Sequence, residues 1–563
     1  MTQRLPVVLL WHMHQPQYRD ALTGQYVLPW TYLHAIKDYI DMGAHLEAHP
    51  GARAVVNFTP VLIEQLQELA ERISQHLRHG APLPDPVLAL LGPGDVPQAP
   101  AERLELLRAC LRAQRKQMIE RYGPYLELAT IAETLATVER IPYASDQLIH
   151  DLAVWYHLAW IGETVRRSDH RVAALTEQGR GFTSEQRRTL LALIGELVAN
   201  VVPLFRRLSE KGQCELSITP YGHPIIPLLL DFHAARESMP GVALPKHAEY
   251  PGGAERAVWH VNEGLRVFTE AFGVEPVGCW PSEGAISRGT LELLERSGFK
   301  WIATSANVLR GGLVAAGTPA ADDPRAYNRP YSLPGSKLRC FFRDDALSDR
   351  IGFNYASWHG DDAARNFVHE LTQLAHLYED SPDHAVLIAL DGENAWEHYA
   401  FNGYYFLRAL YATLADHPMF ELTTLSECVK RGLEPTPLPR VVAGSWVHGT
   451  LATWMGDSSK NAAWDLLCEA KETFDRVLRH LDASQRISAE RQLALCESSD
   501  WFWWFGDYNP PDAVSQFDRL YRRQLVNLYR ILNVAPPANL SQPVSIGRGS
   551  PEHGGAMRRA FAD

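Results

Sequence analysis

Cysteine, clustered positive charge and long apolar runs are all scarce in this sequence. Its 563 residues include seven cysteines, an odd number with no CxxC pair, which excludes a disulfide framework and a thiolate zinc site. The net charge of −12 argues against a nucleic-acid partner, which favours a basic face. No run reaches the roughly 18 to 20 apolar residues of a membrane span, and the apolar start of the chain is too short for a signal peptide. We therefore expect a cytoplasmic protein that binds neither nucleic acid nor membrane.

The chain is much longer than one compact core usually allows. Hydrophobic residues make up 46% of it and charged residues 21%, which is ordinary for a globular protein. Fifteen tryptophans are many for this length. Most of them are expected in the core, but those that lie beside polar motifs suggest stacking on sugar rings. We expect one large catalytic domain with insertions and a second, smaller domain.

Short apolar runs bounded by polar, Gly or Pro residues recur along the chain and predict strands. Most are nearly continuous rather than alternating, which is typical of strands buried on both faces of a parallel sheet. Helical patterns follow several of them, for example at 289–297 and 362–378, as in α/β proteins. The predicted strands are 7–10, 54–58, 215–218, 276–280, 301–304, 338–342, 386–390 and 420–423.

Polar residues emerge where a barrel needs them. His12 and His14 follow the first predicted strand, Glu283 the fourth and Asp391 the seventh. Active sites of α/β barrels form at the carboxyl ends of the strands, whereas an open sheet gathers only residues near its switch point. Motifs spread from the first to the seventh strand converge more easily in a closed barrel, so we predict an α/β barrel.

The domain organisation follows from breaks in the strand–helix pattern. We predict a catalytic barrel at 1–435 with a helical insertion at about 63–208, where Thr183 and Gln186 have the form of a capping box. A C-terminal helical domain is expected at 436–535. The last segment, 536–563, is rich in Pro, Gly, Ser and Arg and is expected on the surface or disordered.

Two carboxylates carry the chemistry that we expect. Glu283 lies between Pro281 and Gly284 in a constrained turn, and rigid placement suits a nucleophile. The alternative role for Glu283 is a first-turn acid on the next helix. Asp391 emerges first from a very apolar strand and should have a raised pKa, as a general acid requires. Glu393 and Glu397 compete for that role, and a metal-binding acidic loop is the other interpretation. The pair of acids is what glycosidic bond cleavage needs.

Other polar residues suggest a binding pocket. His12 and His14, at alternate positions after a strand, suit either metal ligation or hydrogen bonds to sugar hydroxyls. Glu215 inside a strand must be paired or face a polar cavity, and a structural ion pair is the alternative. His223 precedes Pro224, which predicts a rigid extended turn. Aromatic candidates for sugar stacking are Trp446, Trp454, Trp464 and the run 499–507, of which core packing claims at least half.

Taken together, these motifs resemble those of glycoside hydrolase family 57, over about residues 7 to 535. The subgroup that the chain is most similar to is the amylopullulanase and α-amylase type. One departure is Gln213-Cys214 before Glu215, where other members show Gly-Asn. The matching segments, in order, are His12-x-His14-Gln15-Pro16, Glu215 in its strand, Trp280-Pro281-Ser282-Glu283, Asp391-Gly392-Glu393, and Thr453-Trp454-Met455-Gly456-Asp457 with Lys460-Asn461-Ala462-Ala463-Trp464.

The resemblance implies a (β/α)7 barrel with a C-terminal helical domain and retention of configuration at α-glucosidic bonds. Glu283 is then the nucleophile and Asp391 the acid/base, with carboxyl groups about 5 to 5.5 Å apart. We expect an α-glucan partner such as maltodextrin, glycogen, starch or pullulan, and we expect no cofactor or metal. The expected substrate-binding residues are His12, His14, Glu215, His223, Trp280, Glu393, Trp396, Trp454, Asp457 and Trp503.

Other functions use parts of the same pattern. A 4-α-glucanotransferase or a glucan branching enzyme would use the same carboxylates, with a sugar hydroxyl instead of water accepting the intermediate. A metal-dependent glycosidase or deacetylase would use His12 and His14 as ligands. A non-catalytic glucan-binding protein is a third alternative, which an intact acid pair disfavours.

Overall fold

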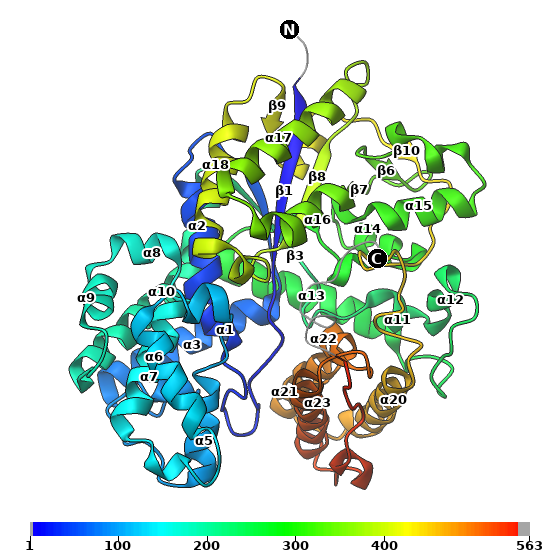
Figure 1. Ribbon diagram of the computed structural model, residues 1–563. Helices are drawn as coiled ribbons and strands as arrows, with labels where there is room; N and C mark the ends of the chain where they lie inside the picture. Colours follow the sequence, from blue (N-terminus) through cyan, green and yellow to red (C-terminus); the bar gives the residue numbers. More distant parts are fainter. Residues whose placement is uncertain (1–3, 550–563) are drawn as a thin grey trace.

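Seven parallel strands close into a barrel at the centre of the molecule (Figure 1). The computed structural model describes residues 4–549. The strands run in chain order around the barrel, and the sixth pairs with the seventh to close it. This confirms the predicted barrel and each of its strands. They are β1 (Leu5–Met13), β2 (Ala54–Phe58), β3 (Cys214–Ile218), β4 (Gly278–Cys279), β5 (Trp301–Ser305), β7 (Arg339–Arg343) and β8 (Val386–Asp391).

Three short strands extend the barrel on its outside. β9 (Phe420–Leu422) pairs in parallel with β1, and β6 (Tyr331–Ser332) pairs antiparallel with β7 and in parallel with β10 (Thr436–Pro437). Inside the barrel, small and aliphatic side chains such as Val8, Val55 and Ala389 pack with Trp280 and Trp301. The interior is therefore a filled apolar core, as in other α/β barrels.

The strand register brings the predicted motifs to one level. His12 on β1 lies opposite Asp391 on β8 and opposite Asn57 on β2. Asn57 in turn lies opposite Ser217 on β3. Because parallel strands end at the same rim, the residues that follow β1, β4 and β8 emerge together. Glu215 lies two residues before Ser217, toward the opposite end of the barrel.

The helices of the predicted insertion divide into two groups. α3 (Pro60–His79) and α10 (Ser184–Glu210) pack on one another, and α10 also contacts β3, so both belong to the barrel wall. Thr183 and Gln186 form the expected capping box at the start of α10. Between α3 and α10, the insertion contains α5 (Pro100–Ala109), α6 (Gly123–Leu135), α7 (Asp146–Trp160), α8 (Glu163–Ser168) and α9 (His170–Gln178).

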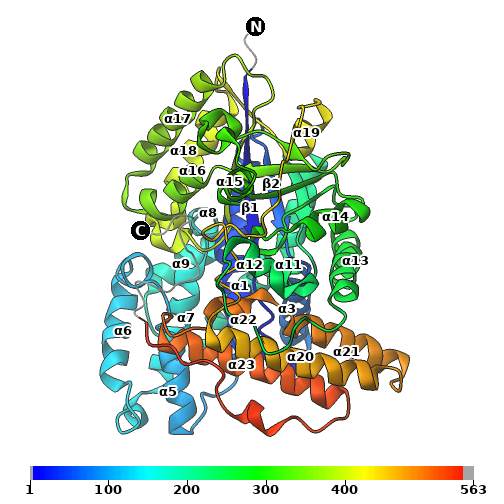
Figure 2. The same ribbon diagram turned by 90° about the vertical axis from the view of Figure 1, so that its right-hand side faces the viewer.

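A bundle of C-terminal helices lies against the rim of the barrel. Figures 1 and 2 show both the insertion and this bundle at the end opposite the N-terminus, which is where the strands end. The insertion and the bundle therefore lie on either side of the rim formed by the carboxyl ends of the strands. The bundle consists of α20 (Ser458–Leu478), α21 (Ala483–Cys496), α22 (Ser499–Trp504) and α23 (Pro511–Ile531).

Two segments bear on the expectations for membrane and tail. α10 is long and apolar enough to cross a membrane by length and composition, although 56% of its apolar window is buried inside the protein. That burial is typical of a core helix. Beyond α23, the backbone N–H of Val544 donates to Asp518 at 2.7 Å, so this part of the tail lies on the bundle. The rest of the predicted tail, 550–563, lies outside the described residues. The domain boundaries stay a prediction.

Candidate active site

The expected catalytic acids open into one cavity of about 320 Å³ at the carboxyl rim. Its lining comes from the barrel, the insertion and the C-terminal bundle, so no single domain builds it. The polar lining residues are His12, His14, Gln15, His34, His223, Glu283, Asp391, Glu393, Asn394, Glu397, Asp500 and Gln516, and the aromatic ones are Tyr18, Trp30, Trp160, Trp446, Trp503, Trp504 and Phe517.

Glu283 is rigidly held after β4. It lies in a short 3-10 turn and has a φ of 58°, a left-handed conformation that non-glycine residues seldom adopt. The carboxylate accepts two hydrogen bonds, from Trp446 Nε1 at 3.0 Å and from Ser499 Oγ at 3.2 Å. The backbone N–H of Trp446 also donates to the carbonyl of Glu283 at 3.0 Å. The predicted constrained turn is confirmed, and the two side-chain hydrogen bonds hold the carboxylate in one orientation.

The surroundings of Glu283 affect its charge in opposite directions. Burial, followed by the negative charges of Asp391 and Asp500, raises the pKa of Glu283 from 4.5 to about 8. The hydrogen bonds from Trp446 and Ser499 act against this rise, because they stabilise the ionised carboxylate. The charge of Asp391 thus disfavours a second negative charge on Glu283.

Asp391 ends β8 and faces the same cavity. Burial raises its pKa from 3.8 to about 6, while a hydrogen bond from Asn394 and the charges of His14 and Arg343 lower it. Asn394 Nδ2 donates to Oδ2 at 2.8 Å. The expected rise in the pKa of Asp391 is confirmed, and burial is its main cause. The expected separation of 5 to 5.5 Å between the two carboxyl groups stays a prediction.

Three histidines stack beside the acids. The rings of His14 and His223 have centroids 3.9 Å apart, and His12 lies 5.3 Å from His223 and 5.8 Å from His14. Burial, and then the neighbouring His14, lowers the pKa of His12 to about 3. The pKa of His223 lies well below its usual range for the same reasons, with His12 adding to the effect. These two rings are therefore neutral and suited to hydrogen bonds with hydroxyl groups.

The turn that holds His223 differs from the predicted extended turn. Its φ is 57°, so the residue is left-handed, and the expectation of an extended turn is wrong. Contacts across the molecule override the local preference: Nδ1 pairs with Ser499 Oγ at 2.7 Å, and the carbonyl accepts from the backbone N–H of Ser499 at 2.9 Å. Among residues 4–549, Nε2 of His223 and Oε2 of Glu393 are buried polar atoms without a hydrogen-bond partner.

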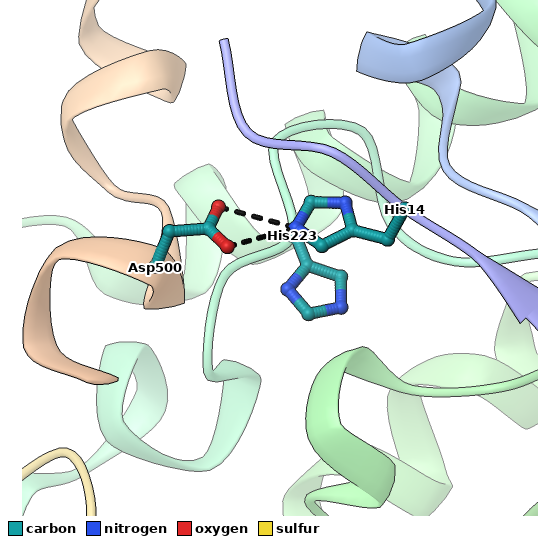
Figure 3. A group of neighbouring side chains, drawn as sticks. All are labelled: His14, His223 and Asp500. Carbon is teal, nitrogen blue, oxygen red and sulfur yellow. Dashed lines mark hydrogen bonds and ion pairs between the residues drawn. The ribbon is translucent and has the colours of Figure 1, made fainter. Parts of the chain in front are cut away.

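Asp500 completes this group, as Figure 3 shows. Its carboxylate contacts His14 Nε2 at 2.9 and 3.2 Å, and ligand atoms of His14, His223 and Asp500 all lie within 4.8 Å of one another. His12 is not part of that group, because its Nδ1 is 2.7 Å from Asn57 Oδ1. The two rings in the group are stacked, 15° from parallel. An imidazole binds a metal in its own plane, so this stacking does not direct both rings at one ion.

Glu215 lies outside the cavity, which corrects its expected role in substrate binding. Its carboxylate accepts from Trp301 Nε1 at 2.7 Å and from the backbone N–H of Ser426 at 2.9 Å. It borders a separate polar pocket with Arg4 and Glu421, at the N-terminal end of the strands. The strand signal was right, but Glu215 lies near the wrong end of its strand to reach the rim.

Several expected stacking residues are core residues instead. Trp280 and Trp454 have no exposed surface and Trp396 is 1% exposed, and none of the three lines the cavity. Their stacking role was predicted because they lie beside polar motifs, but large apolar rings next to a strand end also fill the core. Asp457 is likewise corrected, because it caps α20 by accepting from the backbone N–H groups of Ser459 and Lys460. Of the four tryptophans in the expected substrate-binding set, Trp503 alone lines the cavity, and Trp446 and Trp504 from the wider list of stacking candidates line it too.

Residues from distant parts of the chain were missed as site residues. Trp446 was noted only as a stacking candidate, although it donates to Glu283. Ser499 and Asp500 lie in a noted aromatic run, but nothing local shows which side chains reach the barrel. Trp30 and Trp160 line the cavity from the N-terminal and insertion helices. Trp160 was not predicted as a cavity residue, because an aromatic residue at the end of an apolar helix indicates core packing.

A family model agrees with this geometry. The model described as glycosyl hydrolase family 57 matches residues 8–441, a segment that begins within β1, extends past β10 and includes both acids. The chain belongs to glycosyl hydrolase family 57. The substrate and the reaction type of this chain are separate questions from its membership of the family. None of the curated proteins is similar enough in sequence to match this family 57 chain.

Solved structures share the fold of this family 57 protein across its length. A branching enzyme from Pyrococcus horikoshii has a TM-score of 0.57 at 15% identity and covers 100% of this chain and 99% of its own. A branching enzyme from Thermococcus kodakaraensis also scores 0.57 at 15% identity, with 94% and 90% covered. The α-amylase AmyC from Thermotoga maritima scores 0.56 at 15% identity, with 94% of each chain covered. At this identity the likeness concerns the fold alone.

Proposed function

We propose that this family 57 protein cleaves α-glucosidic bonds by double displacement, with Glu283 as nucleophile and Asp391 as acid/base. The observation that carries the proposal is the pair of acids at one cavity, Glu283 buried and Asp391 half-buried, each with a raised pKa. A retaining glycosidase needs one proton on its two acids at working pH, so that one attacks the sugar carbon and the other protonates the leaving oxygen. Two such carboxyl groups at one cavity favour that singly protonated state.

The division of roles rests on hydrogen bonding. Two side-chain donors, Trp446 and Ser499, stabilise the ionised form of Glu283, whereas Asp391 has one donor, Asn394. In the free protein the higher pKa of Glu283, about 8 against about 6 for Asp391, places the shared proton on Glu283. We propose that the proton moves to Asp391 when sugar binds, and the constrained turn supports Glu283 as the attacking group. Burial and the neighbouring acids oppose this at Glu283. We take the hydrogen bonds as decisive for the complex with sugar.

Substrate contacts are proposed from the unpartnered atoms and the cavity lining. His223 Nε2 and Glu393 Oε2 can each bind a sugar hydroxyl without giving up a bond within the described chain. His12 and His14 lie beside them in the same stack. Trp503 is the tryptophan of the expected substrate-binding set that lines the cavity. An α-glucan such as maltodextrin, glycogen, starch or pullulan would supply both hydroxyl groups and apolar ring faces.

Transfer to a second sugar is the other candidate. Trp30, Trp160, Trp503 and Trp504 add apolar rings to the cavity from three parts of the chain. Such walls favour an acceptor sugar over water, because ring faces stack on pyranoses and reduce hydration. The named structural neighbours include branching enzymes and an α-amylase, but one fold hosts several such activities. We place hydrolysis first and test it against transfer.

Rescue chemistry tests the roles. Glu283→Gln and Asp391→Asn should each lose most activity while remaining folded. With an activated aryl glucoside, azide should restore turnover in both: the nucleophile variant yields a glucosyl azide of inverted configuration, and the acid/base variant a retained one, because retention needs the covalent intermediate. Inverted azide from Asp391→Asn and retained azide from Glu283→Gln would exchange the roles. Near-normal turnover in either variant, without azide, would reject its assignment.

Product analysis tests the reaction type. Hydrolysis of maltoheptaose should give only shorter oligosaccharides and one new reducing end per cut. Transfer gives products longer than maltoheptaose without new reducing ends, and new α-1,6 bonds identify a branching enzyme. Pullulan, amylose and glycogen in parallel separate α-1,4 from α-1,6 cleavage. Predominantly longer products would replace hydrolysis with transfer in the proposal.

A further inference from the structure

A buried cluster of charged and polar side chains lies behind the active site, where hydrogen bonds join α13 (Gly253–Phe272) to the C-terminal bundle. Its centre is Glu497, which follows α21 and has no exposed surface. Arg256 donates to both carboxylate oxygens, from Nε to Oε1 at 2.9 Å and from Nη2 to Oε2 at 2.8 Å. The Tyr250 hydroxyl donates to Oε1 at 2.6 Å, and His260 Nε2 lies 2.7 Å from Oε2. None of these four residues lines the cavity.

Glu497 and Arg256 form a buried ion pair within the cluster. Burial alone would raise the pKa of Glu497, but the charge of Arg256 and the hydrogen bond from His260 lower it to about 2. A buried ion pair usually adds little net stability, because removing the charges from water offsets their attraction. Such a pair contributes more by holding the segments attached to it in one geometry.

Glu497 lies two and three residues before two active-site residues. Ser499 and Asp500 follow it in the chain, and they contact Glu283 at 3.2 Å and His14 at 2.9 Å. On the opposite side of the cluster, His260 Nδ1 accepts the backbone N–H of Gly222 at 3.1 Å, next to His223. One imidazole therefore links the two segments that meet at the nucleophile.

The hydrogen bonds determine which nitrogen of His260 carries the proton. The backbone N–H of Gly222 can only donate, so Nδ1 accepts and Nε2–H donates to Glu497. Burial lowers the pKa of His260 and favours this neutral form. Position 222 is also sterically restricted: a Cβ there would lie 2.6 Å from the carbonyl oxygen of Ala494 and 3.0 Å from His260 Cε1. The turn before His223 is thus packed directly on α21 and on the cluster.

We propose that Tyr250, Arg256, His260 and Glu497 act as a positioning cluster that aligns Ser499 and His223 with the nucleophile Glu283. The inference rests on the proposed function, since alignment matters only if Glu283 attacks the sugar. The cluster sets the distance between the His223 turn and the Ser499 segment, and through Ser499 it sets the orientation of the Glu283 carboxylate.

The test compares kcat and KM on maltoheptaose for Glu497→Gln, His260→Gln and the double variant. Each single change should lower kcat about 10- to 100-fold with KM within about twofold, because misplacing a reacting group by an ångström costs about that much rate. The double variant should be little worse than either single one, since both break the same linkage. Asp518→Asn is the matched control, a buried carboxylate in α23 paired with Arg522, and should keep kcat within about twofold.

Tyr250→Phe and hydrogen exchange keep the test valid if Glu497→Gln fails to fold. Tyr250→Phe removes one hydrogen bond from Glu497 and should lower kcat about two- to fivefold. Exchange at 220–223 and 498–500 should accelerate in Tyr250→Phe and His260→Gln, while the barrel strands keep wild-type rates. Loss of overall stability alone would instead accelerate exchange throughout.

The outcomes separate this inference from the proposed function. If wild type turns over no α-glucan and behaves like Glu283→Gln, the proposed function is overturned and the inference falls with it. If wild type is active but folded cluster variants keep its kcat, or lose activity additively, only the inference is overturned. Unchanged exchange at 220–223 in His260→Gln would also overturn it.

Discussion

Replacing Glu283 with glutamine should stabilise the protein in a pH-dependent way as it abolishes turnover. Burial and two neighbouring acids raise the pKa of Glu283 from 4.5 to about 8. The folded protein therefore binds this proton more tightly than the unfolded chain does. The stabilising effect of the raised pKa is complete below the unfolded value near 4.5 and is lost as the pH rises toward about 8. Glutamine resembles the protonated acid and does not titrate.

The magnitude follows from linkage. One unit of pKa difference corresponds to about 1.4 kcal/mol, so between pH 4.5 and about pH 7 the wild type should lose on the order of 3 kcal/mol from this group. The coupling to Asp391 spreads that loss over both acids, which makes it an upper value. The amide also has only one acceptor oxygen for Trp446 and Ser499, and a mismatched donor costs about 1 to 3 kcal/mol at every pH. At any one pH, the gain in free energy of unfolding from Glu283→Gln is therefore smaller than the change in that gain between pH 4.5 and pH 7.

The assay is urea unfolding of wild type and Glu283→Gln at several pH values from 4.5 to 8. The difference in free energy of unfolding should shift steadily in favour of the variant as the pH rises. Glu292→Gln, a carboxylate on the surface helix α14 (Arg288–Arg296) that pairs with Arg288, is the control and should show no such trend. A difference that stays constant with pH, or that moves toward wild type, would refute the argument that burial keeps Glu283 protonated.

Four further variants test individual contacts. Trp446→Phe removes the Nε1 donor to Glu283 and should lower kcat about 10-fold or more by loss of a charge-assisted bond worth about 1.5 to 3 kcal/mol, with thermal stability little changed; unchanged kcat would remove Trp446 from the site. Glu215→Gln should keep turnover on maltoheptaose but lower the free energy of unfolding by about 1 to 3 kcal/mol, measured in urea, and a selective loss of activity would return Glu215 to the substrate-binding set. Trp503→Ala should raise KM for maltoheptaose, whereas Trp280→Phe should mainly lower Tm, and the reverse pattern would contradict their assignment to cavity and core.

The barrel was predictable because its signal is local. Strands buried on both faces are continuous apolar runs, and each predicted run is a strand in the structure. Glu283 and Asp391 were identified for the same reason, since a polar residue directly after such a run must emerge at the rim. The sequence also contained the tight turn of Pro281 to Gly284, whose left-handed residue the structure then revealed.

The remaining site depends on contacts between segments far apart in the chain. Glu215 is also in a strand, but it begins the predicted run 215–218 and lies two residues before Ser217, near the end of the barrel opposite the rim. A tryptophan beside a motif looks the same in the sequence whether it faces sugar, like Trp503, or core, like Trp280. The His223 turn takes its conformation from Ser499, 276 residues away.

By itself, the sequence determined the barrel and the two acids, because periodicity and chain position specify strands and their ends. The tertiary structure decided which groups surround those acids. Trp446, Ser499 and Asp500 reach the rim only because the chain beyond the last barrel strand folds back over it. Hydrogen bonds and desolvation act over a few ångströms of space, whatever the separation in sequence, so the protonation and alignment of Glu283 are properties of the assembled fold.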